Sequence, residues 1–357
     1  MSPTDCPGCK LTRLFRWYLK WDTNGTIVIR LDPRQRVALV ESELLDDVYR
    51  RIEERVGLPI GRIVFEAERA AAKATMDALL PRRPDRLVRN RLVMHPVSRF
   101  FQLVARIAGL GDFKTVFYHV YEGSLARARN PVNRDILAAM VVGAFESAEG
   151  VVYDHAWVEL GGSLYFLIVP SGRKPDIAVR MAPEIVKPLP GSRKLALCPR
   201  CGLPEMLGHL RWQYDDALIM DTRRDVRMSF IDGYAFSAVF RELIAELGDD
   251  IVPVIVDASR EYARRGIEDT GFLDEAAGRD ESYCRFLDLL PLYGHGNPVG
   301  RELSTDALSV TIENPYSVHL LAGQLLAIYE VLEKREGSVA IDGFAPQKVR
   351  ITVTPGG

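Results

Sequence analysis

Cys6-Pro7-Gly8-Cys9 and Cys198-Pro199-Arg200-Cys201 are two copies of one short motif, 192 positions apart in the chain. Each copy offers two cysteines with a two-residue spacer, which is the spacing that structural zinc sites use. Together the copies supply the four thiolates of a tetrahedral site. The repetition also indicates that the chain consists of two related halves.

After each motif the two halves run in register at an offset of 191. The identical pairs are Leu19/Leu210, Trp21/Trp212, Arg36/Arg227, Val48/Val239, Gly57/Gly248, Ile60/Ile251, Ala67/Ala258 and Arg69/Arg260. Further along, Arg99-Phe100 matches Arg285-Phe286, and Asn130-Pro131 matches Asn314-Pro315. Because the matches keep one order while the offset only shrinks, we expect an internal duplication.

The bulk composition is that of an ordinary globular protein. The chain has 357 residues, 47% hydrophobic and 26% charged, with a formal net charge of −2. This length suits two domains, and the charge does not favour a nucleic-acid or membrane partner. The N-terminal residues show no secretory signal and no stretch is long and apolar enough to span a bilayer, so we expect a cytoplasmic protein.

The periodicity of apolar residues changes repeatedly between about two and 3.6, which predicts an α+β fold in each half. We expect repeat 1 at residues 1–170, a proline-rich linker at 171–194 and repeat 2 at 195–357. In each repeat antiparallel hairpins would pack on helices, and a pseudo-twofold axis would relate the repeats. The linker has five prolines before the second motif, although Ile177–Arg180 could form a short edge strand.

Within each half, the motif is expected to lead into a short helix that ends near Trp21 or Trp212. Ser42 and Asp232 are predicted helix N-caps, and Gly57 and Gly248 are predicted helix ends. Asn-Pro is predicted to open an apolar helix at 134–147 in the first half and at 317–333 in the second, since proline suits a first helical turn. The predicted hairpins are 26–31 with 36–40, 115–121 with 124–128, 151–160 with 163–169, and their counterparts 217–221 with 226–231, 301–304 with 308–312, and 338–342 with 348–353.

The second half resembles a known family of small-molecule-binding domains. The residues that carry the resemblance are Tyr293-Gly294-His295-Gly296, Asn314-Pro315-Tyr316, Leu321-Ala322-Gly323, Ile328-Tyr329-Glu330 and Gly337-Ser338-Val339. This order is similar to that of the domain named after 4-vinyl reductase, which also occurs in hydrocarbon-sensing regulators. The first half has the same order through Gly109-Leu110-Gly111, Asn130-Pro131 and Gly143. The resemblance implies a domain that binds a small hydrophobic molecule.

The chain departs from the metal-binding members of that family. Those members carry cysteines on the apolar helix and in a closing Cys-Arg-Phe segment, whereas Ala, Gly and Leu occupy the helix positions here. Tyr283-Cys284-Arg285-Phe286 matches the closing segment but precedes the hairpin, so it is out of order. The family's metal ligands, haem and catalytic residues therefore do not carry over, and Cys284 is expected to be a small buried apolar residue.

Zinc is the expected cofactor, with Cys6, Cys9, Cys198 and Cys201 as its ligands. One ion shared by both motifs would clamp the halves together, and a closed site of four thiolates would not be catalytic. Two alternatives stay open at this point: reduced or redox-active thiols without metal, and zinc shared between two chains.

No catalytic motif is recognisable in the chain. Aromatic residues gather in particular strands and helices and could line an apolar cavity, although core packing explains such residues equally well. The expected ligand-binding residues are Phe100, Phe101, Phe117, His119, Tyr121, Phe145, His295 and His319.

These observations favour a non-catalytic, zinc-stabilised binding protein for a hydrophobic or aromatic small molecule, acting as a sensor or accessory factor. The alternatives are a subunit of a multi-component enzyme of reductase or carboxylase type, and a structural zinc scaffold for assembly. A protein partner or a homodimer fits each of these functions.

Overall fold

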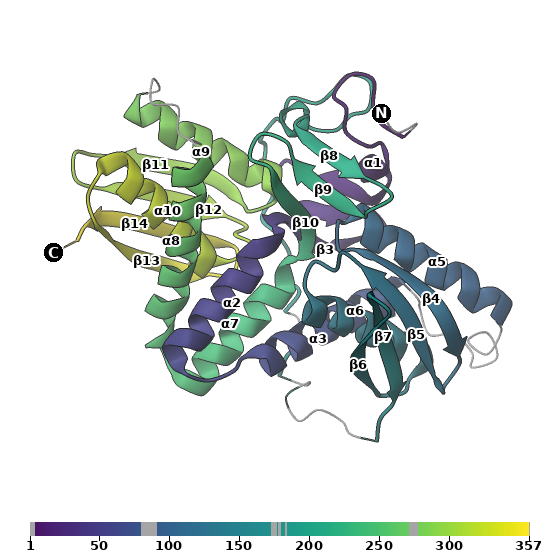
Figure 1. The fold of residues 1–357 in the computed structure, drawn as a ribbon. Helices are drawn as coiled ribbons and strands as arrows, with labels where there is room; N and C mark the ends of the chain where they lie inside the picture. The colour runs from purple at the N-terminus through teal and green to yellow at the C-terminus, as the bar shows by residue number, and fades with distance from the viewer. Residues whose placement is uncertain are drawn as a thin grey trace.

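The computed structural model describes residues 4–79, 91–172, 177, 180–182, 184–270 and 278–356 (Figure 1). The first half contains α1 (Leu14–Tyr18), β1 (Leu19–Trp21), β2 (Ile27–Ile29), β3 (Asp32–Glu41), α2 (Ser42–Val56), α3 (Gly61–Leu79), α5 (Arg91–Ile107), β4 (Asp112–His119), β5 (Gly123–Arg129), α6 (Arg134–Glu149), β6 (Tyr153–Leu160) and β7 (Ser163–Pro170). The second half contains the 3₁₀ turn η1 (Glu205–Leu207), β8 (Leu210–Gln213), β9 (Leu218–Asp221), β10 (Val226–Asp232), α7 (Gly233–Leu247), α8 (Ile251–Thr270), α9 (Arg279–Tyr293), β11 (Asn297–Leu303), β12 (Leu308–Glu313), α10 (Val318–Glu333), β13 (Gly337–Ala345) and β14 (Lys348–Pro355). The predicted α+β class is confirmed.

A six-stranded antiparallel sheet joins the two halves at the centre of the molecule (Figure 1). Its strand order is β1-β2-β3-β10-β9-β8, so each half supplies three neighbouring strands. The two halves meet where β3 pairs with β10, with Leu39 opposite Phe230. Residues 37–40 of β3 are buried without a break, which is the pattern of a strand that is covered on both faces.

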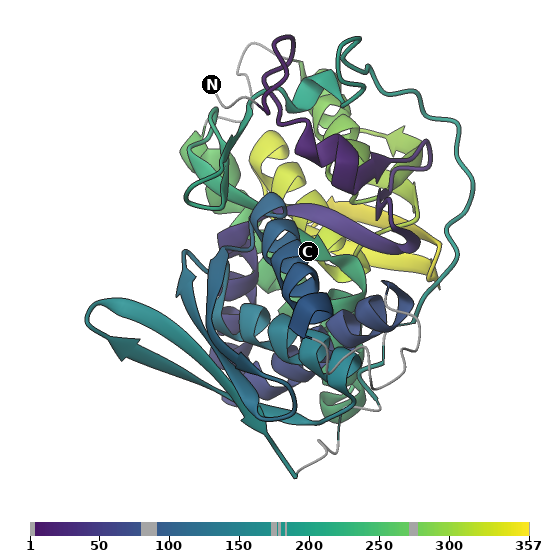
Figure 2. The ribbon, with the colours of Figure 1, turned by 90° about the vertical axis from the view of Figure 1, so that its right-hand side faces the viewer.

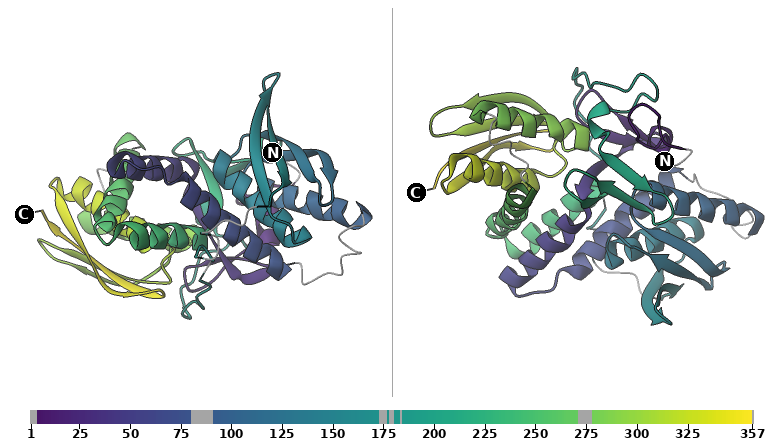
Figure 3. Two further views of the ribbon diagram at one scale, coloured as in Figure 1. Left: turned by 90° about the horizontal axis from the view of Figure 1, so that it is seen from below. Right: turned by 45° about the horizontal axis from the view of Figure 1, so that its top comes forward.

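Each half also forms a four-stranded antiparallel sheet of its own. The orders are β4-β5-β7-β6 in the first half and β11-β12-β14-β13 in the second, which place corresponding strands in the same positions. The two sheets lie at opposite ends of the molecule, with helices between them (Figure 3).

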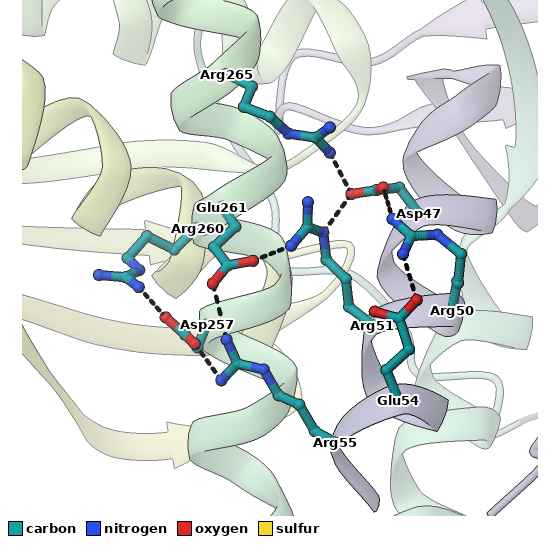
Figure 4. A network of polar contacts seen from close by, with 9 residues as sticks. All are labelled: Asp47, Arg50, Arg51, Glu54, Arg55, Asp257, Arg260, Glu261 and Arg265. Atoms are coloured by element: carbon teal, nitrogen blue, oxygen red, sulfur yellow. Dashed lines mark hydrogen bonds and ion pairs between the residues drawn. The ribbon is translucent and has the colours of Figure 1, made fainter. Parts of the chain in front are cut away.

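The helices cross from one half to the other. Helix α2 packs against α8 of the second half, and α3 packs against α7, whereas α3 and α6 pack together within the first half, as do α8 and α10 within the second. An ionic network covers the α2–α8 contact (Figure 4). In this network Arg51 and Arg55 of α2 both bind Glu261 of α8, and Arg265 donates to Asp47 at 2.6 Å.

Corresponding hydrogen bonds join the β1–β2 hairpin and the β8–β9 hairpin to the opposite half. Trp21 Nε1 donates to Leu292 O at 2.8 Å, and its counterpart Trp212 Nε1 donates to Arg106 O at 2.9 Å. Gly109 follows α5 and Gly294 follows α9, both with φ of +75°. A Cβ at Gly109 would lie 2.8 Å from Met228 O of β10, and one at Gly294 would lie 2.8 Å from Val37 O of β3. The close approach of the two halves therefore requires glycine at both positions.

The linker lies along one side of the molecule. Residues 184–196 have no regular secondary structure, and Figure 2 shows this part as an extended teal trace along one edge. Arg193 anchors it through Asn297 at 3.1 Å and Asp288 at 3.0 Å. Ile177 lies in a turn, so the edge strand proposed there is not formed at this residue; Ala178 and Val179 lie outside the described residues.

Some of the predicted helix ends and helix caps differ from the structure. Trp21 and Trp212 lie in strands β1 and β8 rather than at helix ends. Glu41 occupies the N-cap position of α2, while Ser42 is already helical and its hydroxyl contacts Ser229 Oγ at 2.8 Å. The expected helices after the two Asn-Pro steps are confirmed, since α6 begins at Arg134 and α10 at Val318. The prolines, however, precede the N-caps Asn133 and Ser317, whose side chains accept backbone N–H bonds, and do not lie in the first helical turn.

Other local predictions hold. Asp232 caps α7 by accepting the N–H of Tyr234 at 2.8 Å, and Gly57 ends α2 in the left-handed conformation. The expectation that Cys284 is buried is wrong, because its side chain on α9 is only partly buried. The proposed domain limits at 170 and 195 stay a prediction. In the part of the chain that the structure describes, no helix combines the length and apolarity needed to cross a membrane.

Candidate metal centre and ligand cavity

The two Cys-Pro-x-Cys motifs fold into the same local turn. In the first, Cys6 N donates to Leu11 O at 2.8 Å and Lys10 adopts the left-handed conformation. In the second, Cys198 N donates to Leu203 O at 2.8 Å, and Gly202 is the left-handed residue. These turns direct all four thiols toward one point.

The four sulfur atoms lie within 4.8 Å of one another. Cys6 Sγ lies 3.8 Å from Cys198 Sγ, and Cys9 Sγ lies 3.4 Å from Cys201 Sγ. Tetrahedral zinc with Zn–S bonds of about 2.3 Å requires sulfur separations of about 3.8 Å, whereas a disulfide requires about 2.05 Å. All four cysteines are free, so the donor set and its spacing fit a four-thiolate metal site.

Backbone amides stabilise one thiolate of each motif. The backbone N–H of Cys9 lowers the pKa of Cys6 to about 6, and the backbone N–H of Arg200 lowers the pKa of Cys198. Burial raises the pKa of Cys9 and of Cys201. A metal ion would favour the thiolate at all four positions.

An apolar cavity of about 170 Å³ lies in the first half, between α3, α5, α6 and the central sheet. We call it cavity A. Its aromatic lining comprises Phe100, Phe101, Phe113, Phe145 and Phe230 together with Tyr18 and Tyr118. Phe230 belongs to the second half, so both halves shape this cavity. Cavities of this kind are the usual form of small-molecule sites.

Two carboxyl groups interrupt the apolar lining of cavity A. Glu68 of α3 is 1% exposed, and its Oε1 atom has no hydrogen-bond partner among the described residues. Burial, followed by the charge of Asp232, holds the pKa of Glu68 well above its usual range. Asp232, at the end of β10, has its pKa raised to about 6 by burial, although it accepts backbone hydrogen bonds as a helix cap.

A second cavity of about 110 Å³ occupies the corresponding place in the other half. We call it cavity B. Its residues Met228, Leu39, Glu41, Ala263 and Phe286 are the repeat counterparts of Val37, Phe230, Asp232, Ala72 and Phe100 in cavity A. In cavity B the acid is paired, since Glu41 binds Arg224 and accepts a hydrogen bond from Tyr262 Oη at 2.7 Å.

The structure brings only some of the expected ligand-binding residues together. Phe100, Phe101 and Phe145 line cavity A. Phe117 and His119 do not line it; they stack on each other on strand β4, where Phe117 is 50% exposed. Tyr121 lies in the adjoining turn, where its backbone N–H donates to Glu149. The alternation of β4 therefore turns this aromatic group outward.

The two expected histidines of the second half lie elsewhere. His295 is buried, lines cavity B, and its Nε2 atom lies 2.9 Å from Leu39 O. Burial lowers its pKa to about 4. His319 lines a third cavity of about 270 Å³ under the linker, where Arg36, Glu184 and Arg241 make the wall charged rather than apolar.

Sequence reasoning missed Glu68, Asp232 and Phe230 as cavity residues. A signal for Glu68 was present, because Val64, Glu68, Ala72 and Thr75 recur at helical spacing on one face of α3. Asp232 and Phe230 gave no such signal, since they reach cavity A only through the pairing of β10 with β3.

No family of known proteins matches the chain by sequence, and no curated protein is similar to it. Among solved structures, one similar chain is described as the phenol-responsive sensory domain of the transcription activator PoxR with phenol. It is 13% identical, with a TM-score of 0.34 over 41% of this chain and 85% of that chain. Another comes from a study of haem distortion in the H-NOX family and is 10% identical, with a TM-score of 0.27 over 36% of this chain and 73% of that chain. Similarities this weak carry no argument about function.

Proposed function

We propose that the chain is a non-catalytic binding protein for a hydrophobic or aromatic small molecule, held in cavity A. The observation that carries this proposal is the apolar, aromatic-lined space of about 170 Å³ at the junction of the halves. An engineered cavity of about 150 Å³ with a similar lining stays dry and binds benzene. Cavity A is therefore large enough for a molecule with one aromatic ring.

Zinc has a structural part in this proposal. Cys6 and Cys9 belong to the first half and Cys198 and Cys201 to the second, so one ion bound by all four would tie the two halves together. Four thiolates leave no open coordination position, and the ion would hold the fold rather than react with a ligand.

The position of cavity A supports a sensor or accessory role. Val37 of β3 and Phe230 of β10 both line it, and these strands form the junction between the halves. A ligand would contact both halves at once and would stabilise their arrangement in proportion to its occupancy. A partner that recognises this arrangement would respond to the ligand.

The test is a calorimetric titration with toluene on two matched variants. Ala72→Leu fills cavity A, whereas Ala263→Leu makes the same change at the counterpart position in cavity B. We expect toluene to bind the wild type and Ala263→Leu alike, and to lose at least about tenfold in affinity for Ala72→Leu, because the added methylene groups occupy its space.

Equal loss in both variants, or binding that neither affects, would contradict the assignment of cavity A. If no small apolar or aromatic probe binds while metal content and folding are normal, the scaffold or enzyme-subunit alternatives replace this proposal.

A further inference from the structure

We propose that the ligand of cavity A is a small amine, whose ammonium group binds between the carboxyl groups of Glu68 and Asp232 while its ring or chain occupies the apolar part. This inference rests on the proposed function and specifies the ligand class.

The first step is the unpartnered oxygen of Glu68. The side chain is 1% exposed and lines the cavity, and Oε1 has no partner within the described part of the chain. A buried polar atom without a hydrogen bond costs about 1–3 kcal/mol, and such atoms are rare in folded proteins. A ligand donor placed in the cavity would remove this cost.

The second step is the charge of the lining. Glu68 and Asp232 are both acidic, and neither has a lysine, arginine or histidine nitrogen of the described residues within 4.0 Å. No lysine, arginine or histidine occurs among the described residues of the wall. Arg36 is the nearest described cation that acts on Asp232, but it does not line the cavity. Two carboxyl groups in the wall disfavour anionic ligands and favour a cation, because like charges repel.

The third step is the comparison with cavity B. There Glu41, the counterpart of Asp232, is bound by Arg224 and by Tyr262 Oη. The position that corresponds to Tyr262 in the first half is Ala71, which has no polar side chain. The counterpart of Glu68 is Ser259, whose hydroxyl donates to Leu320 O at 2.9 Å. These two positions in cavity B are therefore satisfied by described residues. In cavity A the corresponding acids, Glu68 and Asp232, have no such side-chain partner among the described residues.

The fourth step is the form of the ligand. An alkylammonium ion, like the side chain of lysine, is charged at neutral pH, and it favours the charged form of a neighbouring carboxyl group. The aromatic wall formed by Phe100, Phe101 and Phe145 suits one ring or a short alkyl chain. Benzylamine has both features and is the probe we choose.

The experiment is a set of titrations with benzylamine, toluene, phenol and benzoate on the full chain. Wild-type protein should bind benzylamine more tightly than toluene or phenol, and benzoate least. In Glu68→Gln the affinity for benzylamine should fall at least about tenfold, as expected for loss of a charge-assisted hydrogen bond, while that for toluene stays within about threefold.

Two further variants serve as a second test and as a control. Asp232→Asn keeps a residue suited to the cap of α7 and should also weaken benzylamine selectively. Tyr262→Phe removes a polar group from cavity B alone and should leave all four affinities unchanged. If the Glu68 and Asp232 variants do not fold, the order of the four probes on wild-type protein decides the question.

The outcomes separate the two claims. Toluene or phenol binding as tightly as benzylamine, or benzylamine binding unchanged in a folded Glu68→Gln, overturns the amine inference and leaves the proposed function standing. If none of the four probes binds, both fail.

Discussion

Leu39 and Phe230 occupy the same position in the two halves and are paired directly opposite each other between β3 and β10. The pairing is symmetric around them, because Glu41 faces Met228 while their counterparts Asp232 and Val37 face each other. The junction of the halves therefore pairs corresponding positions of β3 and β10. This is the arrangement that a pseudo-twofold axis produces.

Removal of the Leu39 side chain tests how much this junction contributes to stability. Leu39 is fully buried in the central strand, so Leu39→Ala should lower the free energy of unfolding by about 2–5 kcal/mol. Leu58→Ala is the control, since Leu58 is 54% exposed and its loss should cost less than about 0.5 kcal/mol. Urea unfolding measures both, and equal effects would show that β3 does not hold the halves together.

A buried ion pair between α3 and α6 gives a second prediction. Arg69 binds Glu66 and Glu146, and all three side chains are less than one tenth exposed. Arg69→Ala leaves two buried carboxylates without a partner, and we expect a loss of about 3–5 kcal/mol in stability. Arg50→Ala removes an exposed arginine from two surface ion pairs and should cost no more than about 1 kcal/mol. Thermal unfolding of the two variants side by side would contradict the account if Arg50→Ala were the more damaging.

We expect the buried side chain of His295 to make the free energy of unfolding depend on pH. Its pKa in the folded protein is about 4, below its ordinary value of 6.5, because it is buried. The stability linked to His295 is therefore fully present above pH 6.5 and is lost as the pH falls toward 4, by up to about 1.4 kcal/mol per pH unit. His295→Gln keeps a donor for Leu39 O and does not titrate. The stability difference between wild type and variant should shift against the wild type between pH 7 and pH 5; a constant difference would show that His295 is not held neutral.

The metal site predicts a selective effect of cysteine replacement. Wild-type protein purified without added metal should contain one zinc per chain, and Cys6→Ser or Cys198→Ser should lose zinc and unfold at a lower temperature, because binding of this kind contributes on the order of 10 kcal/mol in peptide systems. Cys284→Ser is the control, since Cys284 lies on α9 away from the motifs. Half a zinc per chain in an obligate dimer would instead place the ion between chains.

Local patterns predicted most helices and the hairpins correctly. Gly57 marked the end of α2 because it takes the left-handed conformation, and the spacing of the cysteines predicted that their four sulfur atoms lie close together. Strands β1 and β8 were missed because three or four residues around a tryptophan carry too little periodicity to separate strand from helix.

Cavity A was predictable only in part. Phe100 and Phe145 were candidates because aromatic residues cluster along the chain, but the same reasoning chose Phe117, which alternation turns to the surface. Phe230 reaches the cavity through a pairing between strands of different halves. No local pattern encodes such a contact, since it depends on how the two halves assemble.

The most direct test of the binding proposal is an NMR titration with toluene of protein that carries ¹³C-labelled methionine methyl groups. Met76 and Met140 line cavity A, Met228 lines cavity B, and Met206 is 49% exposed outside both. We predict saturable shifts of the Met76 and Met140 resonances, with Met228 and Met206 unchanged. Shifts confined to Met228, or no shift at saturating toluene, would contradict cavity A as the ligand site.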